Sequence, residues 1–417
     1  MKSHIFHNNQ HLQTGQQPVV LFIAGSFFPK PTGATHAAYR LACKLREHGV
    51  DVKWLVDRVP NGQSVESYDG FSVESMWLNS GGPVRKLLSA FRVAFALRFS
   101  GNSPRILHFH GGGHMNLLLS RFLKITTGIP CLMKTTLQGW DTPDGIKKYK
   151  WSDFCTSSYM CLDAVVAMTS GIADEIKNAG YNGHLHIIPN GVDLNEYRPP
   201  TVEEKRRLRC EFALHETRPV ILYSGYLGYV KGIDVLLQVC ARLWAGGKDF
   251  DLLLVGDYTD MKQIGGSIQA YADKIGGNAA AIRHDCIKYV GFTDRISNYM
   301  KAADIFIFPS RQEGFGTVQI EAMACGVPIV ANDLPGLTCD IIPTSKEGFR
   351  VQNINVDHFV DALVLLLSDP ATRQKIGSKG MEHVQRYFSL DSVAKRYLQL
   401  YSILGLFGES TPAELPH

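Results

Sequence analysis

Several kinds of sequence signal are scarce or missing in this chain of 417 residues. No run of five or more Lys or Arg occurs and the formal net charge is only +4, so a nucleic-acid-binding footprint is not supported. The longest apolar runs fall short of the roughly 18 to 20 residues that span a bilayer. We therefore expect no nucleic-acid partner, and any contact with a membrane to be peripheral.

The cysteines form no recognisable framework. Their number, nine, is odd, and they include no C-x-x-C pair and no Cys/His cluster, which argues against a disulfide scaffold or a structural zinc site. The stretch from Met1 to Gln17 is polar and lacks the apolar segment of a signal peptide. A cytoplasmic protein in a reducing compartment is the expectation.

Familiar catalytic signatures are also missing. Gly-x-Ser-x-Gly, the P-loop and the protein-kinase motifs do not occur, and Gly25, after the first strand candidate, lacks the second and third glycines of a dinucleotide-binding fingerprint. These absences disfavour hydrolase, NTPase and dehydrogenase interpretations. No D-x-D cluster suited to a divalent cation follows a strand, so we expect no metal and no cofactor.

Short aliphatic runs alternate with longer amphipathic stretches, which is the pattern of βα units around a parallel sheet. The length allows two domains with separate cores. We predict an α/β fold of two Rossmann-like, doubly wound domains, residues 1–198 and 199–385, that face each other across a cleft. The last amphipathic stretch, in 386–417, is expected to form a helix that crosses back to the first domain.

The strand candidates are Val19–Ala24, Val52–Val56, Ile106–Phe109, Cys131–Thr135, Ala164–Met168 and His186–Ile188 in the first half, and Val220–Ser224, Asp251–Val255, Tyr289–Phe292, Ile305–Pro309 and Ile329–Asn332 in the second. Ligands of such sheets bind outside the carboxyl ends of the strands, so the loops that follow strands deserve most attention.

The strongest local signal follows the strand candidate Ile305–Pro309. Glu313-Gly314-Phe315-Gly316 precedes a helix expected to begin near Thr317, and glycines before a helix N-terminus form a plausible diphosphate cradle. Glu321 lies about one turn inside that helix, so both carboxylates can reach the rim of one pocket and accept hydrogen bonds from sugar hydroxyls. The alternative for the pair alone is that Glu321 complements the helix dipole and Glu313 is solvated.

A second loop, from Tyr223 to Gly232, contains Gly225 and Tyr226 and places Lys231 at a helix start. A cation there is unfavourable for the helix, which suggests a bound anion, although a solvated lysine is the alternative. In the first half, His108 and His110 share one face of a strand that ends in three glycines. His110 is a candidate for contact with a sugar hydroxyl or for proton handling, and a purely structural histidine is the alternative.

The stretch from Arg85 to Phe99 predicts a basic amphipathic helix. Such a helix can lie on anionic lipid, or it can pack its apolar face against the domain sheet, and we favour the packing.

Taken together, these segments resemble glycosyltransferase family 4, whose members are retaining enzymes of the GT-B fold. The likeness extends over nearly the whole chain. Besides the Glu313 and Lys231 loops, the matching segments are Pro31–Ala34, His108–Gly111, Leu162–Ser170, Ile188–Asp193, Val255–Asp257, Val290–Asp294 with Gly291 and Phe292, and Cys325–Val330.

The resemblance implies a nucleotide-sugar donor site. Glu313 would contact hydroxyls of the donor sugar, Glu321 the ribose, and Lys231 the diphosphate, while backbone from Gly314 to Thr317 would contact phosphate and sugar. Gly33 would approach the diphosphate from the other domain, and His110 would face the transferred sugar. The further donor-site candidates, in the matching loops, are Gly225, Tyr226, Gly291 and Phe292.

The leading hypothesis is a retaining transfer of a hexose-type unit from a UDP- or GDP-sugar to a glycan or lipid-linked acceptor. One departure matters, because Tyr226 stands where the family usually has Arg to grip the diphosphate beside the lysine. The alternative is therefore a catalytically weak protein of this fold that binds nucleotide or partners another transferase. A sugar-nucleotide epimerase of the same fold has no motif of its own here.

Overall fold

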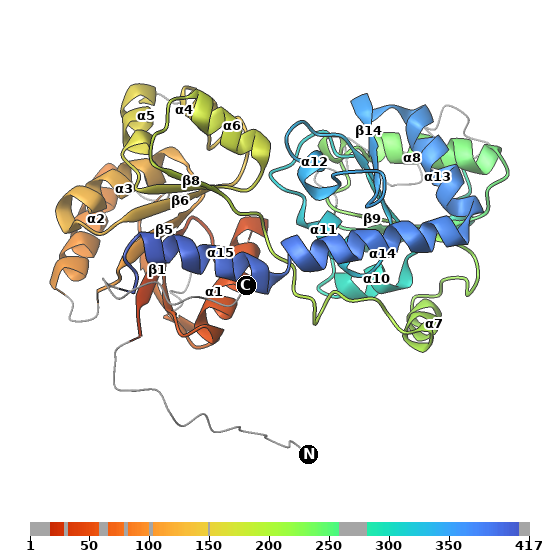
Figure 1. Cartoon of the computed structure of the whole chain (residues 1–417), viewed down its shortest axis with the longest axis horizontal. Coiled ribbons are helices and arrows are strands. Elements are labelled where there is room, and N and C mark those ends of the chain that lie inside the picture. The colour runs from red at the N-terminus through yellow and green to blue at the C-terminus, as the bar shows by residue number, and fades with distance from the viewer. Residues whose placement is uncertain are drawn as a thin grey trace, which may run out of the picture.

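A computed structural model of the chain describes residues 17–28, 32–57, 66–78, 82–99, 103–148, 151–257 and 282–407. The segment Met1–Gln17, which we predicted to lack a signal peptide, lies outside the described residues except for Gln17. Two α/β domains lie side by side, each built around one mainly parallel sheet (Figure 1). The prediction of two doubly wound domains is confirmed.

The first sheet has eight strands in the order β3-β4-β2-β1-β5-β6-β7-β8, all parallel except the edge strand β3. Its strands are β1 (Val19–Ala24), β2 (Asp51–Asp57), β3 (Ser67–Tyr68), β4 (Phe71–Met76), β5 (Ile106–His110), β6 (Cys131–Thr135), β7 (Ala164–Ala167) and β8 (His184–Ile187). The helices of this half are α1 (Gly33–Glu47), α2 (Pro83–Phe99), α3 (His114–Thr127), α4 (Pro143–Ile146), α5 (Ser152–Met160) and α6 (Ser170–Asn178).

The second sheet has six parallel strands in the order β11-β10-β9-β12-β13-β14. These are β9 (Val220–Ser224), β10 (Asp251–Val255), β11 (Ile287–Gly291), β12 (Ile305–Phe308), β13 (Ile329–Asn332) and β14 (Phe349–Val351). The helices around it are α7 (Val202–Glu211), α8 (Ile233–Ala245), α10 (Ile296–Ala302), α11 (Thr317–Ala324), α12 (Thr338–Ile341), α13 (Val356–Ser368) and α14 (Pro370–Tyr387).

The predicted strands all form, with ends that differ by at most two residues. Strands β1, β6, β9 and β10 are buried at every position. Helices cover both faces of a parallel sheet, so such strands are mostly apolar and easy to find in the sequence. Three strands were not predicted: β3 has two residues, β14 has three, and β4 is a half-buried strand with Ser and Glu on its exposed side.

The last helix, α15 (Leu390–Ile403), packs against α1 of the first domain, as Figure 1 shows at the blue end of the chain. Tyr397 and Tyr401 of α15 are fully buried there, and the Tyr401 hydroxyl lies 2.7 Å from Nδ1 of His108 on β5. Beside the linker, Val192 pairs with Ser389 as an isolated parallel bridge. Two chain segments therefore connect the domains. The division at residues 198 and 199 stays a prediction.

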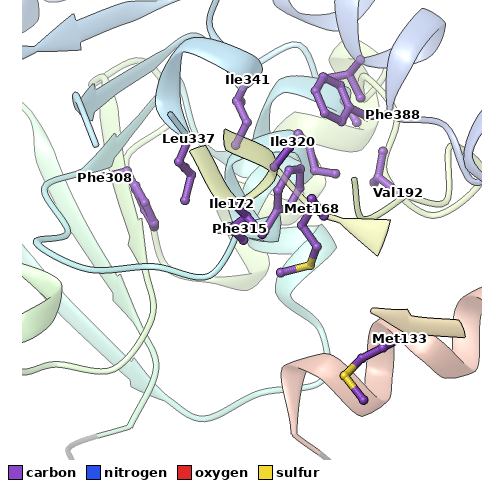
Figure 2. Packing of buried hydrophobic residues seen from close by; sticks show 14 of the residues in the cluster. Met133, Met168, Ile172, Val192, Phe308, Phe315, Ile320, Leu337, Ile341 and Phe388 are labelled. Atoms are coloured by element: carbon purple, nitrogen blue, oxygen red, sulfur yellow. The ribbon is translucent and has the colours of Figure 1, made fainter. Parts of the chain in front are cut away.

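One hydrophobic cluster is shared by both domains. Figure 2 shows Met168 and Ile172 of the first domain among Phe315 and Leu337 of the second. A hydrogen bond of 2.9 Å from the amide of Gly171 to the carbonyl of Gly336 joins the same two regions. Apolar packing and backbone hydrogen bonds thus hold the cleft walls together at one end.

The favoured packing of the helix around 85–99 against its domain is confirmed only in part, because Val93 and Ala94 belong to the core and Ala90 and Leu97 pack against it. Within α2 only Val93 and Ala94 are buried. The large apolar side chains that stay more than half exposed are Val84, Leu87, Leu88, Phe91, Phe95 and Phe99. A narrow side of α2 therefore faces the domain, whereas most of its large apolar side chains stay exposed. The described residues contain no helix that is both long and apolar enough to cross a bilayer.

Candidate active site

The largest concentration of predicted site residues lies in a cleft of about 390 Å³ between the two domains. In each sheet the strand order reverses between two neighbouring strands, β1 and β5 in the first sheet and β9 and β12 in the second. Loops at the carboxyl ends of such strands diverge and leave a crevice. The loops from the two sheets meet here, so the cleft is the expected binding site of the fold.

The loop Glu313–Thr317, which we call the anion-binding loop because its sequence predicts a diphosphate site, forms part of the second-domain wall of the cleft. Gly316 has a φ of +75° and precedes α11 without any side-chain cap, which leaves the first amides of the helix open to a ligand. A Cβ on Gly314 would lie 2.3 Å from the carbonyl oxygen of Thr136 in the other domain. Glycine at 314 therefore lets the two walls approach closely.

Lys231 lies at the end of a short 3-10 turn, Tyr229–Lys231, just before α8. Its Nζ is 2.6 Å from Oε1 of Glu313, and both side chains are mostly buried. The two predicted residues are thus brought together as an ion pair that lines the cleft. Gly225 and Tyr226 line the same wall, and the Tyr226 side chain is 57% exposed, so a ligand can reach it.

The first-domain wall contains Gly33 and His110. A Cβ on Gly33 would have no heavy atom within 4 Å, so the surrounding fold leaves room for a larger residue at this position. His110 is buried and stacks on His108 with ring centroids 4.1 Å apart, and its Nε2 has no hydrogen-bond partner. Burial, reinforced by Lys134, holds the pKa of His110 well below its usual value. His110 is therefore neutral at pH 7 and suited to a hydrogen bond with a sugar hydroxyl.

Three predicted residues do not line the cleft. Glu321 is only 6% exposed, and its Oε1 accepts a hydrogen bond of 2.9 Å from Nη1 of Arg40 on α1. Burial raises the pKa of Glu321, and Arg40 opposes that shift. Gly291 ends β11, and Phe292 is 82% exposed. The donor-binding roles of these three residues stay predictions.

Among the cleft residues that sequence reasoning missed are Lys134 and Asn190. Nζ of Lys134 donates a hydrogen bond of 2.7 Å to Oδ1 of Asn190, and Nδ2 of Asn190 donates one of 3.1 Å to Oγ1 of Thr317. A lysine within the buried apolar strand β6 was the available signal, because lysine is rarely buried without a partner. Asn190 lies in the segment Ile188–Asp193, which matched the family but was given no role in the site.

In the parts of the chain that the structure describes, no group of three or more His, Cys, Asp or Glu is arranged to hold a metal ion. Two Rossmann-like domains with a ligand cleft between their strand ends define the GT-B class of fold.

The comparisons with known proteins identify the family. The family described as Glycosyltransferase Family 4 matches residues 31–196, and that described as Glycosyl transferases group 1 matches residues 204–383. The chain belongs to glycosyltransferase family 4, as its motifs predicted.

Among curated relatives, the chain is similar to a GDP-mannose-dependent monoacylated alpha-(1-6)-phosphatidylinositol monomannoside mannosyltransferase of Corynebacterium glutamicum, with 31% identity over 50% of this chain and 54% of the relative. It is also similar to a D-inositol 3-phosphate glycosyltransferase of Xylanimonas cellulosilytica, with 29% identity over 58% of this chain and 57% of the relative. The chain thus spans little more than half the length of these relatives.

Solved structures resemble the chain over more than nine tenths of its length. Sucrose-phosphate synthase from Thermosynechococcus elongatus superposes with a TM-score of 0.72 at 21% identity, covering 93% of this chain and 99% of that one. HepE of Anabaena in complex with UDP gives a TM-score of 0.73 at 18% identity, covering 92% of this chain and 99% of that one. At these identities the likeness establishes the fold.

Proposed function

We propose that this protein is a retaining glycosyltransferase. It moves a hexose-type unit from a UDP- or GDP-sugar to a glycan or lipid-linked acceptor in the synthesis of cell-surface polysaccharide or glycoconjugate. The observation that carries the proposal is the meeting of Lys231, Glu313 and the uncapped start of α11 in one interdomain cleft. A cation and free backbone amides suit a diphosphate, and the adjacent carboxylate suits sugar hydroxyls.

The chemistry needs an anionic leaving group to be stabilised. As the bond between the sugar and the diphosphate breaks, negative charge grows on the phosphate oxygen, where fixed donors act most strongly. Lys231 and the amides of Gly316 and Thr317 are such donors. The acceptor attacks from the same face, and its proton passes to the leaving diphosphate, so no protein nucleophile is assigned. Neutral His110 orients the transferred sugar.

The relatives support the donor and acceptor classes. One is named for GDP-mannose and a phosphatidylinositol mannoside, and one solved structure with this fold holds UDP-glucose. The experiment is a transfer and hydrolysis assay over a panel of UDP- and GDP-sugars, with acceptors that include lipid-linked glycans. Equal rates for the wild type and for Glu313→Ala would refute the role of Glu313.

A second candidate is suggested by Tyr226, which occupies the cleft where the resemblance leads us to expect Arg. In this alternative the protein binds nucleotide or partners another transferase but transfers sugar poorly. Calorimetry that detects UDP or GDP binding, together with no turnover on any acceptor of the panel, would favour it.

We also propose a cytoplasmic protein that touches the anionic inner face of a membrane through α2. The exposed apolar residues Leu88, Phe91 and Phe95 follow one another at helical spacing along this helix. Its charged residues are all basic, namely Arg85, Lys86, Arg92 and Arg98. An apolar stripe flanked by cations alone fits anionic lipid better than water. A lipid-linked acceptor would then be presented next to the first domain.

A further inference from the structure

Lys134 has an unusual position for a lysine. It is the fourth of five residues of β6, which is buried at every position, and the lysine itself is only 5% exposed. The Nζ atom has a neutral partner, Oδ1 of Asn190, and in the described part of the chain no carboxylate forms an ion pair with it. A buried ammonium without a counter-charge is costly, so the fold alone gives no reason for a lysine at this position.

The surroundings of Lys134 are polar but uncharged. His108 and His110 face it from β5, and the ring of Tyr397 on α15 lies 6.0 Å from its Nζ. Burial and the neighbouring Lys134 hold both histidine pKa values well below the usual value, so both rings are neutral at pH 7. Burial alone lowers the pKa of Lys134 to about 7. Its charge state therefore responds to whatever occupies the cleft.

A short chain of hydrogen bonds connects Lys134 to the anion-binding loop. Asn190 joins its ammonium to Thr317, the first residue of α11, with bonds of 2.7 Å and 3.1 Å. On the opposite wall, Glu313 compensates the charge of Lys231 at 2.6 Å. Among the described residues that line the cleft, Lys134 is thus the cation that has no anionic partner.

We propose that Lys134 binds the diphosphate of the nucleotide and stabilises it as the leaving group, with Asn190 as a positioning residue. This inference rests on the proposed function. When the bond from the anomeric carbon to the phosphate oxygen breaks, the electron pair stays on that oxygen. The acceptor oxygen bonds to the anomeric carbon, and its proton moves to the diphosphate. Lys134 supplies, from the first domain, the second cation that Tyr226 does not provide in the second.

The first experiment measures proton uptake. UDP and GDP are titrated into the protein by calorimetry at pH 8 in two buffers with different ionisation enthalpies. The terminal phosphate, with a second pKa of about 6, is already deprotonated there. Because a bound anion favours charged Lys134, we expect the wild type to take up close to one proton per nucleotide. Unchanged nucleotide affinity in Lys134→Met would overturn the inference, whether or not the wild type takes up a proton.

Variants separate binding from structure. Lys134→Met should abolish the proton uptake and weaken UDP or GDP binding about ten- to hundredfold, the loss of one charge-assisted hydrogen bond. Uridine and guanosine, which lack phosphate, should bind as before. If Lys134 only supports Asn190, the variant would weaken nucleoside and nucleotide alike and leave the uptake unchanged, and the inference would be wrong.

A second variant serves as rescue. Lys134→Met with Tyr226→Arg should recover most of the nucleotide affinity without recovering the proton uptake, because arginine stays charged at pH 8. No recovery would count against a shared role of the two positions in binding the diphosphate. Failure of the wild type to bind any nucleotide would refute the proposed function itself, whereas strong binding that is indifferent to Lys134 would refute this inference alone.

Discussion

Arg40 of the first domain and Glu321 of the second form an ion pair between the two domains, with 2.9 Å between Nη1 and Oε1. The Glu321 side chain is 8% exposed and that of Arg40 is 26% exposed. The pair joins α1, which begins at Gly33, to α11, which begins at the anion-binding loop. Contact of Glu321 with the ribose, the role that the resemblance implies, requires this pair to open.

Arg40→Met should destabilise the protein by about 2–3 kcal/mol, below the full cost of splitting a buried pair because Arg40 is partly exposed. The loss should also depend on pH. The pKa of Glu321 is already raised by burial and rises further without Arg40. Stability of the variant should therefore be highest below the unfolded pKa and fall more steeply than that of the wild type as pH rises from 5 to 7. Urea unfolding at several pH values measures this.

The matched control for that series is Arg40→Met combined with Glu321→Gln. A neutral amide needs no counter-charge, so this double variant should lose the extra pH dependence. Identical pH slopes for the wild type and Arg40→Met would contradict the importance of the pair.

Glu313→Gln is expected to lower kcat/KM for transfer about a hundredfold, in the range found when one transition-state contact is removed. It should also destabilise the protein by about 1–2 kcal/mol, because it removes the carboxylate that pairs with the mostly buried Lys231. Affinity for UDP or GDP should change little, since neither has the sugar that Glu313 is proposed to contact.

Lys231→Ala provides the contrast, because it should weaken UDP and GDP binding directly. Initial-rate kinetics and calorimetry on both variants separate the two roles. A loss of UDP affinity in Glu313→Gln equal to that in Lys231→Ala would show that the two residues act on the same ligand group.

Much of this site could be predicted from the sequence, because parallel strands covered on both faces are continuous apolar runs and the loops after them are easily placed. The direction in which the Glu321 side chain points from its helix could not be predicted. The spacing from Glu313 to Glu321 crosses a loop before α11 begins at Thr317, so helical periodicity alone does not fix its direction. Its partner, Arg40, is 281 residues away, and only the approach of the two domains reveals it.

The packing of α2 was predicted only in part, for a related reason. Its apolar residues have helical spacing, but the pattern does not say whether protein or solvent covers them. Only the narrow stripe with Val93 and Ala94 is buried against the domain.

Lys134 was overlooked because a lysine inside an apolar strand was interpreted as part of that strand, and its position at the cleft beside the end of the strand was not considered.

Gly33→Ala should separate ligand contact from folding. The added methyl group meets no protein atom within 4 Å, so stability should change by less than about 0.5 kcal/mol. If a diphosphate approaches this backbone, the methyl group should raise KM for the donor about tenfold or more. An unchanged donor KM in Gly33→Ala would refute the close approach of the diphosphate.

Gly314→Ala is the opposite case, because its methyl group would clash with the Thr136 carbonyl even without ligand. This variant should lower the melting temperature of the protein.

Membrane contact through α2 can be tested by sedimentation with vesicles. The wild type should bind vesicles that contain anionic lipid, and binding should weaken with salt because Arg85, Lys86, Arg92 and Arg98 contribute electrostatically. Leu88→Ser combined with Phe95→Ser should reduce binding at least tenfold, since each removes an exposed apolar side chain worth about 1.5–3 kcal/mol when buried in lipid.

A control pair of exposed apolar residues is available on the second domain, where Val202 and Leu365 are 89% and 44% exposed. Val202→Ser combined with Leu365→Ser should leave vesicle binding unchanged, because neither residue lies on α2. Both double variants change exposed positions only, so their melting temperatures should remain close to that of the wild type. Equal binding by the α2 variant and this control would mean that α2 is not the membrane surface.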